Sequence, residues 1–581
     1  MKRFGLNIGI MVAIVLLLSV GTSLATDRWS YTTKGQVNWL HISQAGTLLY
    51  ATDEGLYSLD PETGKLAWSR EEFKKVPEFN FVEIESTPLL LIADNSGTFQ
   101  KNTRLVALDA LSGQTVWETE KLKGSVIDLS YSVPHDLALM FVSETPGSRA
   151  KVDITGLTLS TGEVVFNTPL DDKVDLYIAD KSSRFAPRFD LSGHARPTFE
   201  GDSVYLAFAG IHKLDLKTGK ILWQSAFDVT EKAFSKTNAS PLVSGNLVYS
   251  SAKGVIRAFD KNSGELKWTS TDYGAGVAEM TVVDGVLYGR MGGTFYETNR
   301  REYQLKKPLG VVALDSAAGT LKWKYDGAKD SITNIALIPE QGLLLIADHK
   351  DLIALDLKSS GNVKETYKIP MEFVAKKIGA AGKVARIGMG VLGHGVLGGA
   401  KAAKGKENED PPISVLRRDD GQIIVRAKQN VLSFDPSTRK VNWGSSFDAP
   451  GISGWEKLAV GAIFAMMYTV ETAHAARTQA GTSENTFANS ARRDIMNSWS
   501  KMLSKRYTAG MAKSDTVYIL TDINNDEGKG AGLVAVSLKD GEAGASALFK
   551  DKEPLYEVDE MAGVVYRVHK GANKIVATEL R

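Results

Sequence analysis

The chain has 581 residues, with 69 Lys and Arg against 68 Asp and Glu, and it contains no cysteine. A formal charge of +1 gives no general attraction to nucleic acid, so we expect no nucleic-acid partner. The lack of cysteine excludes disulfides, thiolate nucleophiles, Fe–S clusters and a lipid anchored through a Cys. Glycine is enriched, with 54 residues against an average usage of about 7%. The positions of these glycines therefore bear on the fold.

Residues 1–25 have the features of a signal peptide. Lys2 and Arg3 precede an uncharged apolar run over 8–20, and small residues stand just before Thr26. We therefore expect a mature chain that begins at Thr26 and lies in the periplasm or outside the cell. An uncleaved membrane anchor is the alternative, although the apolar run is short for a span of about 20 residues.

One phrase recurs along the rest of the chain, with Asp first, Gly four residues later and Trp eight residues later. Its complete copies are Asp60–Gly64–Trp68, Asp109–Gly113–Trp117, Asp215–Gly219–Trp223, Asp260–Gly264–Trp268 and Asp315–Gly319–Trp323. Its altered copies are Asp435–Trp443 with Arg439 in the glycine place, Thr158–Gly162–Phe166, Asp356 with Gly361 one residue late, and Ser537–Gly541. Such internal periodicity is typical of repeat architectures.

The residue types of the phrase predict two strands joined by a turn. Alternating or apolar runs such as 48–59 and 343–355 precede the Asp and carry Gly, Asn or Asp at their centres, which predicts hairpins. In the turn, Asp accepts backbone N–H groups and Gly permits a positive φ. Trp supplies a large apolar surface for packing between sheets. Short antiparallel strands repeated four to a unit predict an all-β fold, a single closed β-propeller of four-stranded blades over residues 26–581.

The motif Ala-x-Asp-x-x-x-Gly-x-x-x-Trp is complete at Ala107–Trp117 and at Ala258–Trp268. It resembles the tryptophan-docking repeat of the PQQ-like, quinoprotein-type β-propellers, and the resemblance covers most of the chain from about residue 40. It implies that each Trp stacks on the Gly of its own phrase and on the Ala of a neighbouring blade. The repeat residues so assigned are Trp68, Trp117, Trp223, Trp268, Trp323, Trp443, Gly64, Gly113, Gly219, Gly264 and Gly319.

The two ends of the chain are expected to close the ring. The C-terminal residues 564–580 form a hairpin pattern that stops where an outer strand should follow, and Trp29–Gly35 has the pattern of that strand. Pairing the ends would leave no open sheet edge. Counting hairpins gives eight to ten blades, and eight is usual for the family resembled.

Two stretches interrupt the repeat. The first, 373–410, is rich in Gly and Lys, and its cations Lys376, Lys377, Lys383, Arg386, Lys401 and Lys404 are candidates for contact with an anionic membrane surface or a partner. The second, 455–508, has helical patterning and includes the apolar run 458–470. That run would be about 20 Å long as a helix, too short to span the bilayer. Helical insertions that pack on each other or on the propeller rim are the alternative interpretation.

Few sequence motifs indicate catalysis, metal binding or cofactor binding. Gly388, Gly390 and Gly393 match G-x-G-x-x-G, but they lie in an insertion and not in an αβ unit, so we interpret them as a glycine-rich loop. Asp522, Asn524 and Asp526 resemble a calcium loop, but Leu533 stands where a bidentate Glu is needed, which favours a hairpin loop. The eight histidines are dispersed, and no nucleophile elbow or phosphate loop occurs. We therefore assign no catalytic residue and no metal site, and leave any cofactor-binding residues open.

Two functions remain. The first is an exported, non-catalytic scaffold that binds other envelope proteins, as envelope propellers similar to this family do, with no cofactor. The alternative is a quinoprotein dehydrogenase that uses PQQ and calcium. Such enzymes commonly carry a ring of adjacent cysteines, which this chain cannot form, so we favour the scaffold. Association with the membrane surface through the two insertions is a further alternative.

Overall fold

The protein is described from a computed structural model. The described residues are 25–96, 102–143, 150–174, 176–180, 188–191, 195–231, 234, 237–297, 302–371, 385–386, 410–450, 515–525, 528–549, 551 and 554–580. Residues 1–24 of the predicted signal peptide 1–25 and nearly all of the insertions 373–410 and 455–508 lie outside them.

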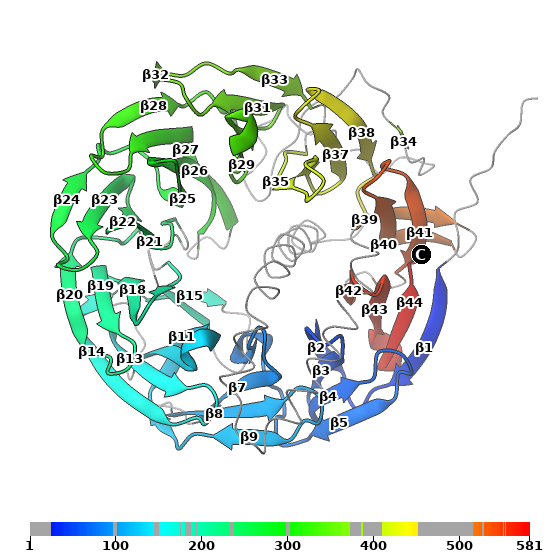
Figure 1. The fold of residues 1–581 in the computed structure, drawn as a ribbon. Helices are drawn as coiled ribbons and strands as arrows, with labels where there is room; N and C mark the ends of the chain where they lie inside the picture. Colours follow the sequence, from blue (N-terminus) through cyan, green and yellow to red (C-terminus); the bar gives the residue numbers. More distant parts are fainter. Residues whose placement is uncertain are drawn as a thin grey trace, which may run out of the picture.

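Ten antiparallel sheets follow one another around a ring (Figure 1). Within each blade the chain starts at the innermost strand and works outward, because consecutive strands are joined by short hairpins. The predicted all-β propeller is confirmed, and the blade count of ten lies at the upper end of the predicted range.

The first five blades comprise residues 37–269. Their strands are, for blade 1, β2 (Val37–Ile42), β3 (Leu48–Thr52), β4 (Gly55–Leu59) and β5 (Leu66–Arg70); for blade 2, β6 (Phe81–Glu83), β7 (Leu89–Ser96), β8 (Asn102–Asp109) and β9 (Thr115–Glu118), with β10 (Leu122–Lys123) also on β8; for blade 3, β11 (Ser125–Ser132), β12 (Leu137–Ser143), β13 (Ala150–Thr158) and β14 (Val164–Val174); for blade 4, β17 (Thr198–Glu200), β18 (Ser203–Ala207), β19 (Gly210–Asp215) and β20 (Ile221–Ala226); for blade 5, β21 (Leu242–Ser244), β22 (Leu247–Ala252), β23 (Val255–Asp260) and β24 (Leu266–Thr269). A separate hairpin of β15 (Leu176–Asp180) and β16 (Arg188–Leu191) lies between blades 3 and 4.

The other five blades complete the ring. Their strands are, for blade 6, β25 (Val277–Val283), β26 (Val286–Glu297), β27 (Glu302–Asp315) and β28 (Leu321–Tyr325), with β32 (Gly361–Asn362) added in parallel; for blade 7, β29 (Ala336–Ile338), β30 (Leu343–Ala347), β31 (Asp351–Asp356) and β33 (Tyr367–Pro370); for blade 8, β35 (Ser414–Arg417), β36 (Ile423–Arg426), β37 (Asn430–Asp435) and β38 (Lys440–Ser446), with β34 (Ala385–Arg386) added; for blade 9, as far as it is described, β39 (Thr516–Asn525), β40 (Gly528–Ser537) and β41 (Ala543–Leu548); for blade 10, β42 (Leu555–Asp559), β43 (Val564–His569), β44 (Lys574–Glu579) and β1 (Thr26–Thr32). Four short 3-10 helices lie in connections: η1 (Glu78–Asn80), η2 (Val133–His135), η3 (Pro339–Gln341) and η4 (Lys570–Ala572).

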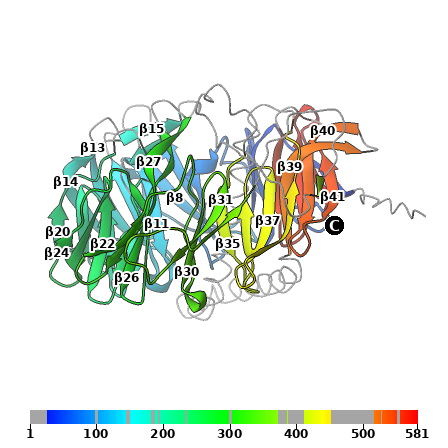
Figure 2. The same ribbon diagram turned by 90° about the horizontal axis from the view of Figure 1, so that it is seen from above.

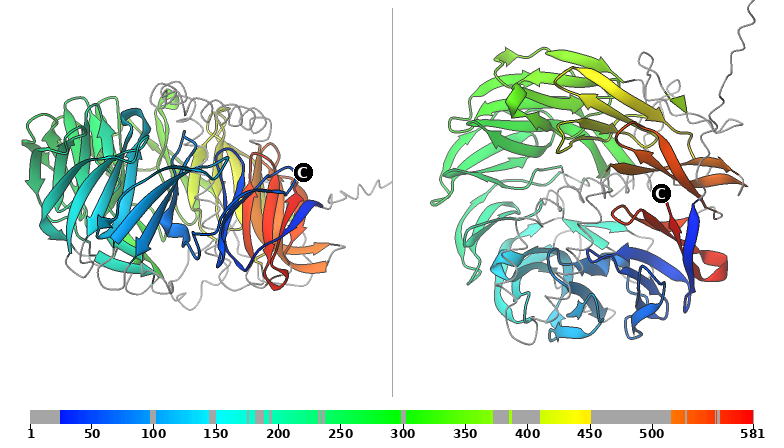
Figure 3. Two further views of the ribbon diagram at one scale, coloured as in Figure 1. Left: turned by 90° about the horizontal axis from the view of Figure 1, so that it is seen from below. Right: turned by 45° about the vertical axis from the view of Figure 1, so that its right-hand side comes forward.

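The ring closes through the two ends of the chain, as predicted. Strand β1 pairs antiparallel with β44, with Trp29 opposite Ala577 and Thr32 opposite Lys574. Figure 3 shows β1, in blue, beside the red strands of the last blade. The strand begins a little earlier than the predicted Trp29–Gly35. N-terminal residues therefore complete the last blade.

The core lies between neighbouring blades. One cluster joins Leu49 of blade 1 to Leu90 and Val106 of blade 2, and each of these side chains is almost fully buried. Similar clusters lie between the following blades, such as Tyr205 and Trp223 of blade 4 with Phe259 of blade 5. Burial of this kind supplies the main favourable term in folding.

The docking Trp residues contact the glycine of the next blade, with Trp323 as the exception. A Cβ added to Gly113 would lie 2.4 Å from the ring of Trp68, and one added to Gly319 would lie 2.4 Å from Trp268. The expectation that each Trp stacks on the glycine of its own phrase is therefore wrong. The indole N–H also reaches the next blade, and Trp68 Nε1 donates to Ala110 O at 3.0 Å. The ring contact, though not in every case the hydrogen bond, is repeated by Trp29 on Gly64, Trp117 on Gly162, Phe166 on Gly219, Trp223 on Gly264 and Trp443 on Gly541.

The turn that presents each glycine is fixed by its Asp. Asp260 Oδ1 accepts the N–H groups of Asn262 and Ser263 at 3.0 and 2.8 Å. The N–H of Gly264 donates to Asp260 O at 2.9 Å, and Gly264 has a φ of +74°. The backbone N–H groups hold the pKa of the Asp260 carboxyl below its ordinary value.

Candidate functional site

A long hairpin in blade 6 extends past the strands beside it. Residues 286–291 of β26 and 310–315 of β27 pair with each other, and β25 and β28 lie on either side of them. Residues 293–297 and 302–306 pair only with each other among the blade strands. Figure 2 shows this hairpin reaching toward the edge of the ring on which β15 lies. It is the longest described hairpin and projects as a surface of its own.

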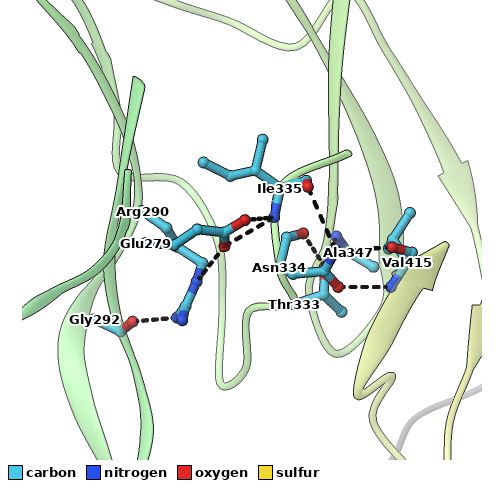
Figure 4. Close-up of polar contacts among 8 residues, drawn as sticks. All are labelled: Glu279, Arg290, Gly292, Thr333, Asn334, Ile335, Ala347 and Val415. Atoms are coloured by element: carbon cyan, nitrogen blue, oxygen red, sulfur yellow. Dashed lines mark hydrogen bonds and ion pairs between the residues drawn. The ribbon is translucent and has the colours of Figure 1, made fainter. Parts of the chain in front are cut away.

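The base of this hairpin is fixed by a partly buried ion pair (Figure 4). Arg290 Nε lies 3.1 Å from Glu279 Oε2 on the innermost strand β25, and Arg290 Nη1 donates to Gly292 O at 2.6 Å. Gly292 has a φ of +66° at the bulge where the hairpin leaves the blade. A β-bulge with a positive-φ glycine redirects a strand, and here the arginine holds the redirected backbone.

The tip of the hairpin contacts the connection between blades 4 and 5. The backbones of Glu297 and Phe234 form an isolated antiparallel β-bridge. Lys306 forms an ion pair with Glu231, and its ammonium group lies 4.1 Å from the centre of the Phe234 ring. Blade 6 is thereby joined to the connection between blades 4 and 5. The β26–β27 hairpin, called the braced hairpin below, is therefore held by side-chain contacts at both its base and its tip.

Polar side chains also tie blade 7 to its neighbours (Figure 4). The carboxylate of Glu279 accepts the N–H of Ile335, at 3.2 Å for Oε1 and 3.1 Å for Oε2. Asn334 pairs with both backbone groups of Val415 on β35, at 2.8 and 3.0 Å. Blades 6, 7 and 8 are thus joined near the inner end of their sheets.

A second polar cluster lies on the innermost strands of blades 10, 1 and 2. His41 Nε2 on β2 lies 3.0 Å from Glu83 Oε2 on β6. Glu83 Oε1 accepts the N–H of Gln44 at 2.9 Å. Glu557 on β42 is half-buried and acts electrostatically on His41. Next to them, the Tyr131 hydroxyl of blade 3 accepts the N–H of Glu85 at 3.2 Å.

The charges in this inner cluster are coupled. Burial alone would lower the pKa of His41, but the hydrogen bond to Glu83 and the charges of Glu83, Glu557 and Glu78 together raise it. Burial raises the pKa of Glu557 to about 7, against the opposing effect of His41. The cluster can therefore hold a proton near neutral pH.

The described residues do not fit the calcium that accompanies PQQ. No three His, Asp or Glu side chains among them come together as a metal site. In the inner cluster, both oxygens of Glu83 already accept hydrogen bonds, from His41 and from Gln44. We therefore derive no chemical step through that cofactor.

The structure places the candidate residues of the sequence as follows. Asp522 and Asn524 lie in the straight strand β39, Asp522 Oδ2 is 3.7 Å from Lys529 Nζ, and Asp526 lies outside the described residues. Arg386 contributes backbone pairing in β34, and Lys376, Lys377, Lys383, Lys401 and Lys404 lie outside the described residues. In the part of the chain that the structure describes, no helix is long and apolar enough to cross a membrane.

Neither the inner cluster nor the braced hairpin was predicted from the sequence. His41 and Glu83 are 42 residues apart, and Glu231 and Lys306 are 75 apart. The long apolar and polar pattern over 286–315 is the signal that could have revealed the length of the hairpin.

The family model described as outer membrane protein assembly factor BamB matches residues 19–128 and 150–334, just over half of the chain. The chain belongs to this family. The matched residues include blades 1, 2, 4, 5 and 6, most of blade 3 and the closing strand β1. This is most of the arc in which docking Trp or Phe residues follow one another.

Solved structures share the propeller fold at low identity. BamB from Moraxella catarrhalis is 15% identical and covers 73% of this chain and 100% of its own, with a TM-score of 0.32. The quinohemoprotein alcohol dehydrogenase ADHIIG from Pseudomonas putida HK5 is 12% identical over 75% of this chain and 74% of its own, with a TM-score of 0.31. The computationally designed Ika8 protein is 12% identical over 72% and 98%, with a TM-score of 0.34. No curated protein sequence matches the chain.

Proposed function

We propose that this protein is an exported, non-catalytic scaffold that binds other proteins in the cell envelope during the assembly of outer membrane proteins. Membership of the family described as outer membrane protein assembly factor BamB is the observation that carries this proposal. The signal-peptide pattern of residues 1–25 supports export. Rigid blades with projecting hairpins suit recognition without chemistry.

The braced hairpin β26–β27 is the surface we assign to partner binding. Its base is held by Arg290 and Glu279, and its tip by Glu231 and Lys306, so little order has to be gained when a partner binds. Beyond residue 293 its two strands extend past β25 and β28, so this part of the hairpin projects from the blade and offers a surface to another protein.

Site-specific photocrosslinking tests this assignment. A photoreactive residue is placed at Thr294 in the hairpin, and a matched one at Thr218, an exposed residue in the turn after β19. We expect discrete adducts with envelope proteins from position 294 and none from position 218. Absence of adducts from position 294 in an exported, folded protein, or equal adducts from both positions, would contradict the assignment.

The non-catalytic part of the proposal has its own test. The purified protein is titrated with pyrroloquinoline quinone and calcium while the absorbance of the quinone is followed. We expect no saturable change, and saturable binding would overturn the scaffold proposal in favour of a quinoprotein enzyme.

A further inference from the structure

Arg257 on β23 occupies a position that is apolar in blades 2, 6 and 8, while Thr155 stands there in blade 3 and His212 in blade 4. It directly precedes Ala258, and the residues that precede the matching Ala107, Ala313 and Ser433 are Val106, Val312 and Leu432. Those three side chains are buried between blades. A charged guanidinium at this position is therefore a departure that the propeller fold does not require.

The guanidinium of Arg257 has no polar partner among the described residues. Its Nη1 atom is buried and makes no hydrogen bond, and no carboxylate pairs with it. The nearest acid in sequence to its aromatic contact, Asp228, is already paired with Lys253 at 2.8 Å and accepts the N–H of Thr230 at 2.9 Å. A half-buried cation without a counter-charge destabilises the folded state, so we expect an anionic group at this position.

A second unpartnered polar group stands directly beside it. Ser250 on β22 is the cross-strand partner of Arg257, so the two side chains lie on the same face of the blade 5 sheet. Ser250 is fully buried, and its hydroxyl makes no hydrogen bond within the described chain. Two buried donor atoms on adjacent residues, Arg257 Nη1 and Ser250 Oγ, both lack acceptors, which indicates a missing acceptor common to both.

Aromatic rings hold the guanidinium in place. The Arg257 Cζ atom lies 4.6 Å from the centre of the Phe227 ring at the end of blade 4. Phe227 stacks on Phe259 with a ring distance of 6.0 Å and an interplanar angle of 11°. A guanidinium that packs its face on a ring keeps its N–H groups at its edge, where they can donate to an oxyanion.

We propose that Arg257 and Ser250 form a binding site for a small oxyanion, a carboxylate or phosphate group, between blades 4 and 5. Arginine presents a planar fork of donors that suits these groups, and the serine hydroxyl adds a third donor. A water molecule could satisfy Ser250, but it would leave the charge of Arg257 uncompensated. The opposite neighbour of Arg257 is Thr269 on the outermost strand β24, which is exposed, so the proposed site lies next to the outer rim.

Thermal unfolding of the full-length protein in different anions tests the site. The melting temperature is measured in chloride, phosphate and acetate at equal ionic strength, for the wild type and for Arg257→Met. We expect a saturable rise of about 2–4 °C in the wild type with phosphate or acetate, and none in the variant. Phosphate and acetate distinguish a free inorganic anion from a carboxylate, which a partner's side chain could also supply.

Two further variants make the test specific. Arg257→Lys keeps the positive charge but loses the planar set of N–H donors of the guanidinium. We expect it to reduce, without abolishing, the rise in melting temperature caused by the anion. Arg290→Met removes an arginine that is already paired with Glu279, so it should lower stability equally in all three anions. An equal rise in wild type and Arg257→Met, or no rise in either, would overturn the proposal.

Discussion

At the scale of single residues, the docking glycines offer a sharp test because the chain contains a matched control. Gly319 and Gly285 have nearly the same φ, +70° and +74°. A Cβ on Gly319 would collide with the Trp268 ring, whereas a Cβ on Gly285 would meet nothing within 4 Å. The two positions thus separate backbone strain from packing.

We predict that Gly319→Ala destabilises the protein more than Gly285→Ala does. Both substitutions place alanine in the left-handed region, at a cost of about 1–2 kcal/mol. Gly319→Ala must also displace Trp268, which adds about 1–3 kcal/mol. Denaturant unfolding followed by tryptophan fluorescence measures the difference. Equal losses of stability in the two variants would show that the contact with the Trp268 ring is not the reason for a glycine at position 319.

The inner cluster predicts a pH dependence with a defined sign. Glu557 has a pKa of about 7 in the folded protein against an ordinary value of 4.5, so the folded state binds its proton more tightly than the unfolded state. Stability is therefore lost as pH rises from about 4.5 through 7. The raised pKa of His41 acts in the same direction, because its contribution is complete below its ordinary value of 6.5 and is lost above its folded value.

We predict that Glu557→Gln removes much of this dependence. At pH 8 the variant should be more stable than the wild type, by about 2–3 kcal/mol, because it carries no buried carboxylate charge. At pH 4.5 the two should be nearly equal. Unfolding curves at both pH values provide the measurement, and the exposed Glu163→Gln is the control with no expected difference. A variant that is less stable than the wild type at pH 8 would refute the assigned protonation.

At the scale of elements, the altered copies of the phrase show how the docking adapts. Arg439 has a φ of +57° in the place of the docking glycine, and its guanidinium lies 4.9 Å from the ring of Tyr367. Tyr367 pairs with Ala354 as Trp117 pairs with Ala107, so it stands in the Trp place of blade 7. A smaller ring and a cation thus replace the indole and the glycine at this interface.

Trp323 is the other exception. It is fully buried, but its Nε1 atom makes no hydrogen bond among the described residues, and Gly361 has no side chain close to its Cα. The reason is that Gly361 belongs to β32, which pairs in parallel beside Trp323 on β28. The one-residue delay of this glycine in the sequence therefore marks a real structural change.

The strands and turns within each blade could be predicted from the sequence, whereas the side-chain contacts that join one blade to another could not. Each phrase fixes its own turn locally, through Asp, Gly and two strands, so hairpins, fold class and ring closure could be derived. The spacing inside a phrase is the same in every blade, so it cannot reveal whether Trp68 meets Gly64 or Gly113. Contacts such as His41–Glu83 and Asn334–Val415 join different blades through single side chains, and no periodic pattern specifies them.

At the scale of the whole molecule, the ring has two unequal arcs. From blade 10 through blade 6, an aromatic ring covers the glycine of the next blade at every interface. Between blades 6 and 7 and between 7 and 8 this contact is altered, and inner polar contacts from Glu279 and Asn334 join the blades there. Between blades 9 and 10 it is missing because the closing blade takes its last strand from the N-terminus and has no turn to present a glycine.

This asymmetry predicts where the ring opens first. Local opening exposes the least packing where an interface lacks a ring docked on a glycine, so among blades 1 to 8 the free energy of opening should be lowest at blades 7 and 8. We expect the backbone amides of β31 and β37 to exchange hydrogen faster than those of β19 and β23, which occupy the same place in blades 4 and 5. Native-state hydrogen exchange measured by mass spectrometry resolves these peptides. The four strands can be compared because at least half of the residues of each are buried and none is exposed. Equal protection in the two arcs would mean that the inner contacts of Glu279 and Asn334 fully compensate for the lost docking.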